Sequence, residues 1–195
     1  PMHEMMGGID QPDVIAAGAD LILRFKALDR RFVSGPATSA GRDSVFVGFC
    51  HGGEIYNQSP TEMHIEGTRR WLPEADRKAI DTEFCAILDE IAHAHGVQVD
   101  GQCRTVRDAF VLDVQHPFVA AFQDAHEQIV GAALPEGAKP VMDDGNTFCH
   151  HAGIPAITHG PHATGAHTLD EQVPVSELVR VVKVYLQTAM NFCRP

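Results

Sequence analysis

Five periodic segments follow one another in the first 107 residues, and their order constrains the fold more than any other feature of the sequence. Apolar residues recur at helical spacing in 12–32 and 73–95. Residues 44–50, 62–68 and 97–107 are instead β-branched or alternate between apolar and polar side chains. The first and fourth segments are predicted helices, and the other three are predicted strands. The order helix, strand, strand, helix, strand is most of a split β-α-β unit. We therefore predict a ferredoxin-like α+β domain whose first strand is missing.

A different order of predicted elements begins near residue 113, where short strands alternate with helices. The predicted strands are 140–142 and 154–158, and the predicted helices are 117–131, 146–152 and 174–192. This alternation is typical of an α/β sheet. We expect two domains, residues 1–110 and 111–195. The last helix is amphipathic, with one apolar face that such helices turn toward a core: Val175, Leu178, Val179, Val182, Leu186 and Met190.

Charge and composition exclude several classes of protein. The net charge is −11, and no basic patch for a nucleic-acid backbone is visible. No apolar run approaches the roughly 20 residues that span a bilayer, and no secretory signal is visible. The five cysteines form no C-x-x-C pair, which argues against a disulfide framework or a zinc knot. We expect a cytoplasmic protein that binds neither nucleic acid nor membranes.

The loop 160–171 contains the best candidates for chemistry. It follows a short predicted strand and precedes a helix, which is where α/β proteins place ligands. Gly160 and Gly165 allow the backbone to approach a ligand closely. His167 lies beside two acids, Asp170 and Glu171, either of which could orient a metal-bound imidazole through its second N–H. The alternative is a histidine with an ordinary surface contact.

This loop resembles a segment of the M20 family of metallopeptidases and amidohydrolases, which includes acetylornithine deacetylase, succinyl-diaminopimelate desuccinylase and carboxypeptidases. The resemblance rests on Gly153-Ile154-Pro155, Gly160-Pro161, Ala166-His167-Thr168 and Asp170-Glu171, in that order and at nearly the family spacing. It implies that His167 is a ligand of one of two divalent metal ions, expected to be zinc. The chain would then comprise a lid, or dimerisation, domain and the C-terminal segment of an α/β zinc-hydrolase domain.

Two further features resemble the lid of this family. Gly52-Gly53, Asn57, Pro60 and Arg70 match its pattern, which implies that Asn57 and Arg70 bind the carboxylate of a substrate, often across a homodimer. The alternative is a turn asparagine and a strand arginine paired with surface acids. His3 lies where the family has a histidine that stabilises an oxyanion.

The resemblance implies zinc-dependent hydrolysis of an amide bond in an N-acyl or N-carbamoyl amino acid or a small peptide. The family also uses a His-x-Asp pair, a second Asp, a Glu-Glu pair and a glutamate base, all from a half that precedes the lid. None is visible here, so we expect at most a partial metal site.

Alternatives therefore stay open for this chain alone. One alternative is a non-catalytic dimerisation module or a truncated fragment of such an enzyme, and another is a His-rich metal-binding protein. The role of Asp144, in a segment with one inserted residue, also stays open. So do the roles of the four histidines near His167, which are extra ligands or packing residues: His150, His151, His159 and His162.

Overall fold

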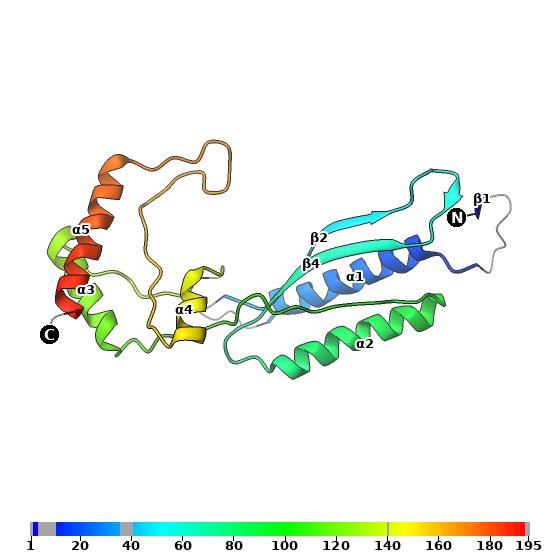
Figure 1. Ribbon diagram of the computed structural model, residues 1–195, viewed down its shortest axis with the longest axis horizontal. Coiled ribbons are helices and arrows are strands. Elements are labelled where there is room, and N and C mark those ends of the chain that lie inside the picture. Colours follow the sequence, from blue (N-terminus) through cyan, green and yellow to red (C-terminus); the bar gives the residue numbers. More distant parts are fainter. Residues whose placement is uncertain (1, 4–10, 36–40, 140, 194–195) are drawn as a thin grey trace. The chain divides into compact units, whose positions relative to one another are not determined.

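The computed structural model describes residues 2–3, 11–35, 41–139 and 141–193. These residues form two compact units, Pro1–Val106 and Arg107–Pro195 (Figure 1). The sequence had placed the division between residues 110 and 111. Helices accompany a small antiparallel sheet, which confirms the mixed α+β class.

The first unit contains a hairpin and two long helices. Its elements are β1 (Met2–His3), α1 (Val14–Val33), β2 (Ser44–Gly52), β3 (Gln58–Ser59), β4 (Met63–Arg70) and α2 (Arg77–His95). Strands β2 and β4 pair antiparallel, with a register shift between Val47 and Phe49, and β1 pairs antiparallel with β3. Helix α1 contacts both strands of the β2–β4 hairpin and lies beside α2 (Figure 1). Both helices and both long strands were predicted from the sequence.

Local chemistry explains where α1 begins and how closely it packs. The Asp13 carboxylate caps its first turn by accepting hydrogen bonds from the backbone N–H groups of Ile15 and Ala16. A Cβ on Gly18 would lie 2.2 Å from the sulfur of Met63 on β4, so glycine is needed for this approach. The core of the unit forms around Ile91, which is 1% exposed, together with Ala17 and Leu21.

The predicted strand at 97–107 is not formed. The segment runs alongside α2 (Figure 1), with Val97 and Val99 packed against the core. A Cβ on Gly101 would lie 2.1 Å from Leu88 of α2, so the chain passes close to this helix. Exposure alternates only over residues 97–100, and residues 101–106 are exposed. A strand also needs a hydrogen-bonded neighbour, and the described residues provide none here.

The second unit is built on two helices that pack together, α3 (Pro117–Val130) and α5 (Val175–Phe192), with a short helix α4 (Asp144–Ala152). Phe122 and Ala125 of α3 and Val181 and Val184 of α5 are buried. The predicted strands at 140–142 and 154–158 are not formed in the described part of this unit, for the same reason as at 97–107.

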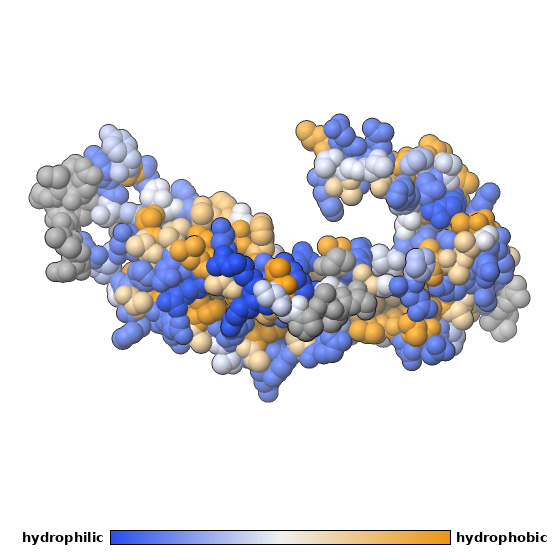
Figure 2. Space-filling view, turned by 180° about the vertical axis from the view of Figure 1, so that it is seen from behind, coloured by the Kyte–Doolittle hydropathy of each residue, from blue (hydrophilic) through white to orange (hydrophobic). Residues whose placement is uncertain are grey.

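Helix α5 buries a different face from the one that its sequence suggests. The buried residues are Val181, Val184 and Thr188. The predicted apolar face is exposed, with Val182 at 65% and Leu186 at 62%. Figure 2 shows that apolar side chains remain at the surface of both units. The reason is that, among the described helices and strands, α5 packs mainly against α3, and α3 covers the other side. No helix in the described ranges is long and apolar enough to cross a membrane.

Candidate functional site

The loop 160–172 is closed by its own hydrogen bonds. Thr164 and Gln172 exchange two backbone hydrogen bonds of 3.0 Å, and the Thr168 N–H donates to the Gly165 carbonyl at 2.9 Å. Gly165 has a φ of 67°, and a Cβ there would lie 2.9 Å from the Asp170 carbonyl oxygen. Only glycine is free of strain at this position. In contrast, a Cβ on Gly160 would meet nothing within 4 Å.

His167 occupies the tip of this loop with an exposed side chain. It is the only non-glycine residue with a positive φ, 64°, in the described ranges, a conformation that is uncommon and worth explaining. The Glu171 carboxylate accepts a hydrogen bond from the His167 backbone N–H at 3.3 Å. Glu171, one of the two acids that the sequence suggested for orienting the imidazole, therefore binds the backbone of His167 instead. The imidazole itself is exposed to solvent.

The described residues do not complete a metal site. Catalytic zinc takes three protein ligands and structural zinc takes four. No group of three or more His, Cys, Asp or Glu side chains converges within the described ranges. His167 supplies one imidazole donor, so the remaining ligands of any zinc site must come from elsewhere.

The neighbouring histidines have structural contacts. His150 lies 3.1 Å from the Asp108 carboxylate, and its ring meets that of His151 edge-on. The His162 backbone N–H donates to Glu177 at 3.0 Å. The pKa of Glu177 is held below its ordinary value by the Arg180 guanidinium first and by this N–H second. The ring contacts favour a structural role for His150 and His151, whereas the bond of His162 involves only its backbone.

The segment around Asp144 forms the start of α4. The Asp143 carboxylate caps the helix by accepting from the Gly145 N–H at 2.8 Å, and the Asp143 N–H donates to the Asn146 side-chain oxygen at 3.0 Å. The Thr158 hydroxyl, then Lys139, lowers the pKa of Asp143. Asp144 is an exposed residue paired with Arg107 at 2.9 Å. The helix cap thus accounts for this acidic segment.

On the hairpin, the structure distinguishes between two adjacent arginines. Arg69 donates to the Asp43 carboxylate at 2.8 Å, and its guanidinium lies 4.5 Å from the centre of the Phe32 ring. Arg70 ends β4, and no hydrogen bond or ion pair holds its guanidinium among the described residues. Arg70 is therefore the one of the two that is available to a ligand.

The structure brings His3 and Asn57 near each other but separates both from Arg70. The backbone of His3 pairs with Gln58, next to Asn57, although the His3 side chain lies outside the described residues. Asn57 lies in the turn before β3, beyond the Met63 end of β4. Arg70 is at the other end of that strand, seven residues away, which corresponds to about 23 Å at the usual rise. One carboxylate cannot contact both Asn57 and Arg70 of this hairpin.

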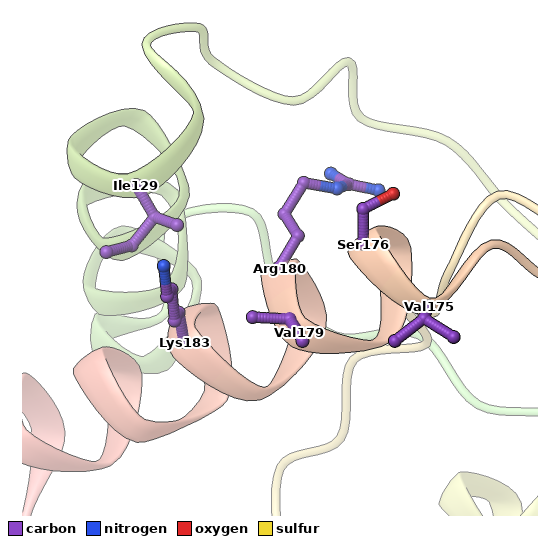
Figure 3. Close-up of a pocket in the computed structure, with 6 residues that line it drawn as sticks. All are labelled: Ile129, Val175, Ser176, Val179, Arg180 and Lys183. Atoms are coloured by element: carbon purple, nitrogen blue, oxygen red, sulfur yellow. The ribbon is translucent and has the colours of Figure 1, made fainter.

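A pocket in the second unit is unrelated to these candidates. It is lined by Ile129 of α3 and by the first turns of α5: Val175, Ser176, Val179, Arg180 and Lys183 (Figure 3). Its walls are apolar apart from one hydroxyl and two cationic groups, and it holds no imidazole, thiol or carboxylate. It has no donor set for a metal ion.

Sequence spacing does not indicate one contact between two histidines, the buried His126 of α3 and the half-buried His159. Their ring centres are 5.8 Å apart. The two residues are 33 positions apart in the chain, and no spacing rule links such positions. Only the packing of α3 against the segment before the loop brings them together.

Comparisons with known proteins agree on one family. The family model described as peptidase family M20/M25/M40 matches residues 7–191. The chain is 29% identical over 87 residues to N-formyl-4-amino-5-aminomethyl-2-methylpyrimidine deformylase of Bacillus subtilis, which covers 44% of this chain and 20% of that protein.

Solved structures show the same fold. The aminopeptidase PepT of Bacillus cereus matches with a TM-score of 0.72 and 17% identity, over 98% of this chain and 48% of that one. A tripeptidase from Staphylococcus aureus matches with a TM-score of 0.74 and 19% identity, over 95% of this chain and 47% of that one. An M20 family metallo-carboxypeptidase from Sulfolobus solfataricus matches with a TM-score of 0.55 and 14% identity, over 88% of this chain and 44% of that one. The chain thus spans about half the length of these proteins.

Proposed function

The chain belongs to peptidase family M20/M25/M40, and we propose that it acts as part of a zinc-dependent enzyme that hydrolyses an amide bond. The substrate is an N-acyl or N-carbamoyl amino acid or a small peptide. The names of similar proteins support this class, because a deformylase, an aminopeptidase and a tripeptidase all cleave a C–N bond at a carbonyl.

The observation that carries the proposal is the presentation of His167. Its ring projects from a turn that Gly165 permits and that Glu171 holds through the backbone. His167 would contribute one ligand to a zinc site whose other ligands lie outside the residues described. Bound zinc would polarise the substrate carbonyl and acidify water. Gly160, which has open space on its Cβ side, would let the substrate approach the backbone.

The hairpin geometry supports a homodimer. His3 and Asn57 belong to one end of the hairpin region and Arg70 to the other, about 23 Å away. Two antiparallel copies would bring the Asn57 end of one subunit to the Arg70 end of the other. In that arrangement Arg70 and the partner's Asn57 would grip one substrate carboxylate, and the partner's His3 would donate to the oxyanion.

A second function suits the chain by itself. The described residues bring together no group of three potential metal ligands. This observation favours a non-catalytic dimerisation module, or a fragment that is active only together with further residues. Native mass spectrometry of the purified chain with zinc distinguishes the two. A dimer without stoichiometric zinc supports the module, whereas two zinc ions per chain would mean that the ligand set is complete here.

The enzymatic proposal is tested in the full polypeptide that contains this chain. Zinc content and hydrolysis of N-acetyl and N-carbamoyl amino acids and of tripeptides would be measured for the wild type, His167→Ala and His162→Ala. We expect His167→Ala to lose zinc and activity together, because removing a ligand opens the site. His162→Ala is the matched control, since only its backbone has a described hydrogen bond. Full zinc content in His167→Ala would contradict the assignment.

A further inference from the structure

His159 ties the start of the 160–172 loop to the helix pair α3–α5. Its ring lies 5.1 Å from Phe122 and 5.8 Å from both His126 and Tyr185, measured between ring centres and in edge-on geometry. The Tyr185 hydroxyl also donates to the His159 carbonyl. Gly160 follows directly, so the loop leaves the helices at this residue. The side chain and the main chain of His159 are both held.

The partner histidine has a defined tautomer. The Nδ1 of His126 lies 2.7 Å from the Ala132 carbonyl oxygen, and a carbonyl only accepts, so Nδ1 carries the hydrogen. The Nε2 of a neutral ring is then a bare acceptor. His126 is 3% exposed. Among the described residues, neither this Nε2 nor the Nδ1 of His159 has a hydrogen-bond partner, and both atoms are buried.

The surroundings disfavour a positive charge on His159. Burial is the main cause that lowers its pKa, followed by His126 of α3 and Arg180 of α5, whereas Glu177 of α5 opposes them. Tyr185 is the other titratable group from α5 at this ring, and burial raises the pKa of its hydroxyl, so it is neutral and offers no countercharge. A proton on His159 would therefore lie among apolar rings and beside a cation, with one opposing carboxylate.

We propose that His159 is a positioning residue, which anchors the loop 160–172 on α3 and α5 when its ring is neutral and releases the loop when its ring is protonated. The inference rests on the proposed function, because this loop carries Gly160, Gly165 and His167. In the packed arrangement the buried Nδ1 of His159 has no hydrogen-bond partner among the described residues, so protonation places an unpaired charge in the cluster. The charged ring gains solvation by leaving the cluster, and the residue that begins the loop then moves with it.

The direction of the pH effect follows from linkage. The ordinary pKa of histidine is 6.5, and that of the packed ring is lower. The released loop therefore takes up a proton at a higher pH than the anchored loop does. Anchoring is complete above the ordinary pKa and is lost as the pH falls below it. Between the two pKa values, the released population rises about tenfold for each pH unit.

Amide hydrogen exchange of the purified chain, read by mass spectrometry, tests this without any need for activity. Exchange in the peptides covering 156–172 would be followed from about pH 8 to about pH 5 and divided by the rate of the unfolded chain at each pH. In the wild type we expect protection to fall by about tenfold per pH unit within the window. His159→Phe keeps a ring between Phe122 and Tyr185 but cannot be protonated, so its protection should not change with pH.

His151→Phe is the matched control. It makes the same change at an exposed histidine of α4 whose ring, among the described residues, has a ring contact with His150 alone, and the pH step of the loop should persist. An equal step in His159→Phe, or none in the wild type, would overturn the proposal.

If His159→Phe does not fold, NMR titration of the wild-type imidazoles decides. We expect the His159 midpoint below 6.5, with loop amide shifts that follow the same curve. A midpoint at or above the ordinary value would refute the anchor. Failure of the zinc assignment would leave these outcomes unchanged, so the two proposals fail separately.

Discussion

Arg69 and Arg70 are adjacent on β4, but only the Arg69 guanidinium has partners among the described residues. The Arg69 guanidinium bonds to Asp43 at 2.8 Å and stacks over Phe32. The guanidinium of Arg70 has no such partner among the described residues. One of the two side chains therefore stabilises the fold, and the other is available to a ligand.

We predict that Arg69→Ala lowers the free energy of unfolding by about 1–2 kcal/mol, because it removes a half-buried charged hydrogen bond and a cation–π contact. Arg70→Ala should change it by less than about 0.5 kcal/mol. Urea denaturation of both variants measures the difference. In the full polypeptide, Arg70→Ala should raise KM for a carboxylate substrate. A large stability loss in Arg70→Ala would show that its side chain is structural.

Gly165→Ala tests whether the loop needs a left-handed residue. The φ of 67° and the 2.9 Å approach to the Asp170 carbonyl predict a loss of more than about 1 kcal/mol, with faster proteolysis inside the loop. Gly160→Ala is the matched control, because its Cβ would meet open space, and it should remain within about 0.5 kcal/mol of the wild type. Thermal unfolding and limited proteolysis measure both. Equal effects of the two variants would contradict the account of the turn.

Asp143→Ala should destabilise the second unit by about 1 kcal/mol, because it removes the cap of α4. Asp144→Ala removes only an exposed ion pair and should cost about 0.5 kcal/mol or less. The Thr158 hydroxyl lowers the pKa of Asp143 below 3.8, so the stabilisation is present above that pH and is lost as the pH falls below it. Denaturant titrations near neutral pH and in acid should show the difference between the variants shrinking in acid. A difference that persists in strong acid would exclude the ionised cap as its cause.

Two valines on α5 test which face of the helix is buried. Val184 is 0% exposed and Val182 is 65% exposed. We predict a loss of about 2 kcal/mol for Val184→Ala, from the deleted methyl groups and the cavity they leave. Val182→Ala should change stability by less than about 0.5 kcal/mol. Chemical denaturation of the two variants compares the same substitution on two sides of one helix. The reverse ranking would mean that the stripe predicted from the sequence is the buried one.

The sequence by itself determined the helices, because their signals are local. Apolar residues at helical spacing predicted helices at 12–32 and 73–95, and the structure has α1 at Val14–Val33 and α2 at Arg77–His95. The sequence identified the loop around His167 as the best candidate for chemistry, and the structure shows Gly165 and His167 with positive φ there. The family match over residues 7–191 agrees with the motif reading. These features depend on residues within a few positions of each other.

Tertiary structure decided everything that depends on distant partners. The segments 97–107 and 154–158 have strand-like sequences but form no ladder, because a strand exists only beside another strand. The choice between Arg69 and Arg70 depends on Asp43 and Phe32, which lie outside β4. His126 and His159 meet only because α3 packs against the chain that leads into the loop. Sequence periodicity records which side chains are apolar, whereas packing decides which of them are covered and which polar atoms have a partner.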